Sequence, residues 1–191
     1  MQGSIILARQ VLPSRNIVRM RLSLSLCLLL TPAVALLAQE PVVGAKDPES
    51  LFHSKDKQLD ANKQVVMHIM RDLLEANHWD EAPKYLSQRY LQHNPNVQSG
   101  LAPVMAFFGN NPARPKTAIP DKDHWKTQVV AVMAEGDLVT VAISREYTDP
   151  NTPGKKYTST WFDMWRIKDG KADEHWDAAT IAARPANTKE K

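Results

Sequence analysis

The strongest constraint on the fold lies in residues 125–181, where apolar and polar side chains alternate with a period of two. Four stretches rich in β-forming residues follow one another there, at 125–134, 138–147, 157–167 and 172–181. Gly136-Asp137 and Asp169-Gly170 supply two of the links between them. Because strands joined by short turns pair antiparallel, this pattern predicts an antiparallel meander.

Helical patterns precede the meander. Residues 57–76 carry apolar side chains at the spacing of one helix face. These are Val66, Ile69, Met70, Leu73 and Leu74. A short helix is expected at 81–86 with Asp80 as its cap, and a third at 101–108. Helices followed by an antiparallel sheet predict an α+β fold, in which the N-terminal helices pack on a curved antiparallel sheet and the sheet encloses a cone.

The turn at Asp169-Gly170 decides which residues of the last hairpin face each other. We expect a three-residue loop that ends at Gly170, which places Asp163 opposite His175. One face of the hairpin then carries Trp161, Asp163, Trp165, Asp173, His175 and Asp177, and the other carries Phe162, Met164 and Trp176. A two-residue turn would shift the pairing by one residue and mix polar with apolar side chains, so the three-residue loop is preferred.

The first 38 residues differ in composition from the rest of the chain. Residues 22–38 form an apolar run that follows Arg19 and Arg21 and ends in small residues, which is typical of a secretory signal. The run is shorter than the ~20 apolar residues of a membrane span, and it contains Cys27, the only cysteine. The sequence therefore predicts a periplasmic or secreted, cysteine-free protein with no stable membrane span after signal removal.

The predicted organisation is a signal peptide at 1–38, a linker at 39–56, one domain at 57–184 and a C-terminal tail at 185–191. Four of the 24 Lys and Arg residues lie in 1–38, together with none of the 21 Asp and Glu residues, so the remainder carries 20 basic and 21 acidic side chains. A nearly neutral remainder with dispersed charges argues against a nucleic-acid partner.

Four segments follow one another in the order of a known family. They are YLQHNPNVQSG at 90–100, MAFFGNNP at 105–112, AEGDLVTV at 134–141 and FDMWRIKDGKADEHWD at 162–177. Together they resemble the SnoaL-like polyketide cyclase proteins of the nuclear-transport-factor-2-like superfamily. The resemblance implies an α+β cone, commonly dimeric, with an internal pocket. It also implies an intramolecular aldol condensation that an acidic residue and a histidine serve without metal or cofactor.

The resemblance assigns acid–base roles to three residues. Asp163 is expected to remove a proton next to a carbonyl, and His175 or His93 to donate one. Structural roles remain open for each of them. Asp163 and His175 would form a cross-strand hydrogen-bonded pair, and His93 would cap the turn at 94–96. The same three residues would also suit a metal ion, but the sequence shows no histidine spacing typical of metal ligands, so no metal is expected.

Four further residues are expected to bind the substrate, namely Tyr90, Trp161, Trp165 and Asp177. Aromatic side chains with a few convergent polar groups are typical of a small-molecule site, and we expect a small apolar ligand. The opposite face of the hairpin is too apolar for open water. It therefore predicts a homodimer through the outer face of the sheet.

The sequence thus predicts an exported pocket protein that acts by acid–base chemistry, of aldol, cyclase or isomerase type, on an apolar carbonyl compound. Two alternatives share the same fold. One is a non-catalytic protein whose pocket binds a hydrophobic ligand. The other is a dimeric protein-interaction module that uses the outer sheet.

Overall fold

The structure is a computed structural model and describes residues 39–181. The predicted signal peptide at 1–38 and the predicted C-terminal tail at 185–191 lie outside the described residues. Within 39–181, no helix combines the length and the apolar character that crossing a membrane requires.

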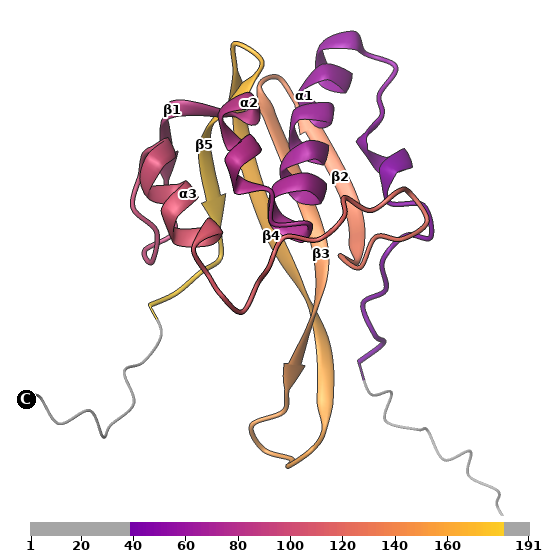
Figure 1. The fold of residues 1–191 in the computed structure, drawn as a ribbon. Helices are drawn as coiled ribbons and strands as arrows, with labels where there is room; N and C mark the ends of the chain where they lie inside the picture. Colours follow the sequence, from indigo (N-terminus) through magenta and orange to yellow (C-terminus); the bar gives the residue numbers. More distant parts are fainter. Residues whose placement is uncertain (1–38, 182–191) are drawn as a thin grey trace, which may run out of the picture. The chain divides into compact units, whose positions relative to one another are not determined.

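Five strands form one sheet in the order β1-β5-β4-β3-β2 (Figure 1). They are β1 (Leu86–Gln92), β2 (Val129–Glu135), β3 (Leu138–Thr148), β4 (Lys156–Lys168) and β5 (Lys171–Asp177). The last four pair antiparallel in chain order, as the meander predicts. The alternating pattern is therefore a correct guide to these four strands.

The strand β1 corrects the prediction of a purely antiparallel sheet. It pairs parallel with β5, so the sheet is mixed. In the sequence LSQRYLQ only Leu86 and Tyr90 become buried apolar residues, which is too sparse an alternation to identify a strand. The pairing with a strand about 85 residues later is a long-range contact that no local pattern indicates.

The helices lie over one face of the sheet (Figure 1). The predicted helix at 57–76 is α1 (Lys57–His68), which continues as a π-helix, η2 (Ile69–Glu75). Asp56 caps α1 by accepting hydrogen bonds from two backbone amides. The other helical elements are η1 (Glu49–Phe52), η3 (Trp79–Glu81), α2 (Ala82–Tyr85) and α3 (Leu101–Gly109). Asp80 lies inside η3, and α2 has no side-chain cap, so the predicted capping role of Asp80 is wrong.

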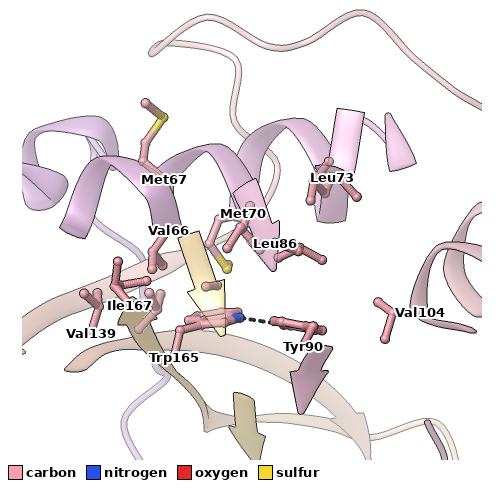
Figure 2. Packing of buried hydrophobic residues seen from close by; sticks show 14 of the residues in the cluster. Val66, Met67, Met70, Leu73, Leu86, Tyr90, Val104, Val139, Trp165 and Ile167 are labelled. Atoms are coloured by element: carbon pink, nitrogen blue, oxygen red, sulfur yellow. Dashed lines mark hydrogen bonds between the residues drawn. The ribbon is translucent and has the colours of Figure 1, made fainter. Parts of the chain in front are cut away.

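The core lies between this helix layer and the sheet (Figure 2). From the helices it contains the apolar stripe predicted for 57–76. From the sheet it contains residues at alternate strand positions. The fully buried members that Figure 2 labels include Val66, Leu73, Leu86, Val104, Val139 and Trp165. The result is the α+β architecture that the sequence predicts.

The turn between β4 and β5 differs from the prediction. Asp169 and Gly170 both have positive φ, 51° and 73°, and Lys168 pairs with Lys171, so the turn has two residues. The predicted three-residue loop is wrong. A bulge follows, because Arg166 pairs with Glu174 while Ile167 pairs with Ala172.

The bulge leaves Asp173 as an extra residue in β5 and restores the predicted separation of faces. Asp163 lies opposite Asp177, and Trp165 opposite His175. The predicted partners were wrong, whereas the assignment of Asp163, Trp165, His175 and Asp177 to one face was right.

Residues 39–56, predicted as a linker, make specific contacts with the sheet and the loops. The backbone amide of Val42 donates to Thr158 Oγ1 at 2.7 Å. Phe52 is fully buried, and its ring centroid lies 5.9 Å from that of Trp125. The side chain of Phe52 therefore belongs to the core.

Replacing this ring tests whether the segment stabilises the domain. Phe52→Ala should lower the free energy of unfolding by about 3–5 kcal/mol, because it removes a fully buried aromatic side chain and leaves a cavity. Urea unfolding followed by circular dichroism measures the change. Val43→Ala is the control in the same segment: Val43 is exposed, so the loss should stay within about 0.5 kcal/mol. An equally small loss of unfolding free energy in both variants would mean that the segment is a linker that does not stabilise the domain.

Candidate functional site

A cavity of about 350 Å³, called here the central cavity, lies between the helices and the helix-facing side of the sheet. Apolar side chains of η2 and α3, among them Met70 and Phe108, line one wall. The sheet supplies most of the polar wall. Its polar or aromatic residues there are Tyr90, Gln92, Arg145, Trp161, Asp163, His175 and Asp177.

A more open depression of about 570 Å³ lies beside Trp79 and residues 109–116. Its oppositely charged side chains Asp80 and Lys116 already pair at 2.6 Å. The central cavity is therefore the better candidate for acid–base chemistry.

The polar wall centres on Asp163 and His175, which are each only 7% exposed. His175 Nε2 lies 3.3 Å from Asp163 Oδ1, and His175 Nδ1 lies 2.9 Å from Gln92 Oε1. An amide oxygen only accepts hydrogen bonds, so Nδ1 carries a proton. His175 thus links the side chain of Gln92 to the carboxyl group of Asp163 at the cavity wall.

Three more hydrogen-bond donors hold the two carboxylates in place. Trp161 Nε1 donates to Asp163 Oδ1 at 3.2 Å. Asp177 accepts from Asn94 Nδ2 at 2.7 Å through Oδ2 and from the backbone amide of Ala179 at 2.9 Å through Oδ1. Both oxygens of Asp177 are therefore occupied, and Asp177 forms a fixed part of the wall.

Tyr90 and Trp165 form a buried pair (Figure 2), and the rings of both lie near that of His175. Trp165 Nε1 donates to Tyr90 Oη at 3.0 Å. Burial raises the pKa of the Tyr90 hydroxyl, so this hydroxyl stays protonated and can donate to a ligand. Of these two residues predicted to bind the substrate, Tyr90 lines the cavity and Trp165 does not. Trp165 lies behind the wall, with its ring centroid 5.0 Å from that of His175.

The structure does not bring His93 into the central cavity. Gln92 pairs with His175 across the β1–β5 ladder, so the next residue, His93, points to the opposite face. There His93 Nε2 lies 2.8 Å from Glu174 Oε1, and its ring stacks on Trp176 at 5.0 Å. The hydrogen bond from His93 lowers the pKa of Glu174. The residues of this stretch that reach the cavity are Gln92 and Asn94. Sequence reasoning missed Gln92 because β1 was not identified.

Three side chains of the wall could hold a metal ion. Asp163, His175 and Asp177 each offer a ligand atom, and these atoms lie within 4.8 Å of one another. Two carboxylates and an imidazole suit a divalent transition-metal ion. The trio differs from the metal site considered in the sequence, because Asp177 takes the place of His93.

A family model described as "SnoaL-like domain" matches residues 68–175. The match covers more than half of the chain and includes Tyr90, Gln92, Asp163 and His175. The chain belongs to the SnoaL-like family. The resemblance seen in the sequence is therefore confirmed, and the mixed sheet with its helix layer is the α+β cone of the nuclear-transport-factor-2-like fold.

Several solved structures are similar to this SnoaL-like domain at low identity. TsrD from Streptomyces laurentii is 17% identical, over 65% of this chain and 90% of that chain, with a TM-score of 0.42. An NTF2-like protein of unknown function from Burkholderia pseudomallei is 17% identical, over 63% and 91%, with a TM-score of 0.45. An LEH-like epoxide hydrolase from M. tuberculosis is 11% identical, over 61% and 80%, with a TM-score of 0.44. No curated protein matches the chain.

The buried pair of Tyr90 and Trp165 gives a test of how the SnoaL-like domain supports its cavity. Tyr90→Phe should lower the free energy of unfolding by about 1–3 kcal/mol, because the buried indole N–H of Trp165 loses its acceptor. Urea unfolding measures the loss. Tyr157→Phe is the matched control, since Tyr157 is exposed and its hydroxyl forms no hydrogen bond within residues 39–181. A Tyr90→Phe protein as stable as that control would contradict the pairing.

Proposed function

We propose that the SnoaL-like domain binds a small apolar carbonyl compound in the central cavity, and that Asp163 and His175 move a proton on it. The reaction class is cofactor-independent aldol, cyclase or isomerase chemistry. We also propose that the chain is exported by its first 38 residues. The N-terminus of protein recovered from the periplasm or the medium would check the export.

The proposal rests on the hydrogen bonds of Asp163, which reach only one of its two carboxylate oxygens. Asp72, Asp173 and Asp177 each have hydrogen-bond donors on both oxygens. In Asp163 both donors, Trp161 and His175, contact Oδ1. Within residues 39–181, Oδ2 of Asp163 has no hydrogen-bond partner. It is not fully buried, so a ligand in the cavity can reach it. An exposed structural carboxylate such as that of Asp56 can leave one oxygen to water, but a buried one with a purely structural role would use both, as Asp72 and Asp173 do.

This arrangement suits proton abstraction next to a carbonyl. Asp163 Oδ2 would take the proton as the C–H bond breaks, and the electron pair would move onto the carbonyl oxygen as an enolate. The hydroxyl of Tyr90 lines the cavity and retains its proton, so it can donate to that oxygen. His175, held by Gln92, supplies the proton that completes an isomerisation or an aldol addition.

An exchange assay tests the proposal before the substrate is known. The probe is 2-tetralone, an apolar ketone with acidic α-protons, in D₂O. Wild-type protein should accelerate the incorporation of deuterium, which NMR follows, and Asp163→Asn should reduce the protein-dependent rate by about 10²–10⁴-fold because it removes the base.

Asp169→Asn is the matched control, because Asp169 lies in the exposed turn between β4 and β5. Its rate should equal that of the wild type. Wild-type protein that binds 2-tetralone without exchange would support the non-catalytic ligand-binding alternative. A rate that EDTA abolishes and Zn²⁺ restores would support a metal ion at Asp163, His175 and Asp177 instead.

The outer face of the sheet supports the proposal of a homodimer. Phe162 is 49% exposed and Met133 is 55% exposed, and both share this face with Met164 and Trp176. A second copy related by a two-fold axis would cover the same apolar residues on both chains.

Light scattering during size-exclusion chromatography tests the dimer. Wild-type protein should elute at the mass of two chains, and Phe162→Lys should give single chains because it places a charge in the apolar contact. Ile181→Lys, an equally drastic change at an exposed apolar residue that follows β5, should leave the dimer intact. A wild-type protein that elutes as single chains would disprove the proposal.

A further inference from the structure

Of the two arginines that line the central cavity, Arg114 and Arg145, only Arg145 has no hydrogen-bond or ion-pair partner within residues 39–181. The helix-facing side chains of β3 are Val139, Val141 and Ile143, all buried, and the next residue in this row is Arg145. Arg145 lines the cavity. Arg145 thus places a guanidinium at the end of a series of apolar side chains on the helix-facing side of β3.

Arg145 differs from the other arginines of the described residues. Arg71, Arg89 and Arg166 each pair with a carboxylate. Arg114 donates to the backbone carbonyl of Leu74. Within residues 39–181, the guanidinium of Arg145 forms neither a salt bridge nor a hydrogen bond.

The position of Arg145 is nevertheless fixed. Its Cζ atom lies 3.7 Å from the centroid of the Trp161 ring, as in a cation–π contact. Trp161 is itself held by its hydrogen bond to Asp163. Stacking uses the flat face of a guanidinium and leaves the N–H groups at its edge free. Arg145 is therefore oriented by the protein, with its donors available.

We infer that Arg145 receives the carboxylate of the ligand, so that the substrate class is an apolar carboxylic acid that also carries a carbonyl group. This inference rests on the proposed function, because it names the substrate class of the same cavity. A carboxylate matches the two parallel donors of a guanidinium. The two aspartates of the wall, Asp163 and Asp177, would repel a dianion such as a phosphate monoester more strongly than a monoanion.

Two probes of equal shape and different charge test the inference. They are 2-naphthoate and its neutral counterpart 2-naphthamide, each titrated into the protein by calorimetry at pH 7.5. Wild-type protein should bind the naphthoate about 10- to 100-fold more tightly, as expected for a charge-assisted hydrogen bond. In Arg145→Met this preference should vanish while the affinity for the amide is unchanged, which also shows that the cavity is intact. Arg145→Lys, which keeps the charge but not the paired donors, should retain part of the preference.

Lys155→Met is the charge-matched control on the same hairpin, since Lys155 is exposed and lies in the link between β3 and β4. It should keep the full preference for the naphthoate. Equal affinity of the wild type for both probes, or a preference that survives in Arg145→Met, would overturn the inference and leave the cavity as a ligand site. Failure of 2-naphthoate to bind would also overturn it, and the 2-tetralone exchange would then decide separately whether the proposed function stands.

Discussion

The geometry of the site depends on one extra residue in β5. The two-residue turn at Asp169-Gly170 on its own would place His175 on the outer face, opposite Met164. The bulge at Asp173 reverses that shift and returns His175 to the cavity. Asp173 is held there by hydrogen bonds from Ser87 and Arg89 of β1, and the bond from Arg89 lowers the pKa of the Asp173 carboxyl. The irregular residue is thus fastened to the neighbouring strand, which stabilises the register on which the acid–base pair depends.

The sequence was sufficient for the features that repeat locally. Alternation along β4 and β5 separated Asp163, His175 and Asp177 from Phe162 and Met164 correctly, even with the wrong turn. The reason is that shortening the turn by one residue moves every side chain of β5 to the other face, and the extra residue of the bulge moves those beyond it back. Sorting the faces by polarity therefore works without knowledge of the exact partners. The partners themselves depend on the φ angles of Asp169 and Gly170, for which the residue types allow more than one solution.

The features that the sequence could not supply arise from long-range contacts. The parallel pairing of β1 with β5 decides that Gln92 faces the cavity and His93 faces away, and the short stretch from Leu86 to Gln92 has too few apolar residues to reveal a strand. Arg145 continues an alternating row on β3, but its contact with Trp161 depends on the pairing of β3 with β4. Motif resemblance pointed to Asp163 and His175, which lie in contact at the cavity wall, whereas the groups that orient them became visible only in three dimensions.

Trp161 connects the two polar ends of the central cavity. One face of its indole carries Arg145, and its N–H holds Asp163 Oδ1. Because the indole is rigid, it restricts the separation between the guanidinium and the free oxygen of Asp163. A ligand whose carboxylate pairs with Arg145 must then bring the C–H group next to its carbonyl to Asp163 Oδ2 across that separation. The spacing of the carboxylate and the carbonyl within the ligand, more than its total volume, would therefore decide which apolar acids react.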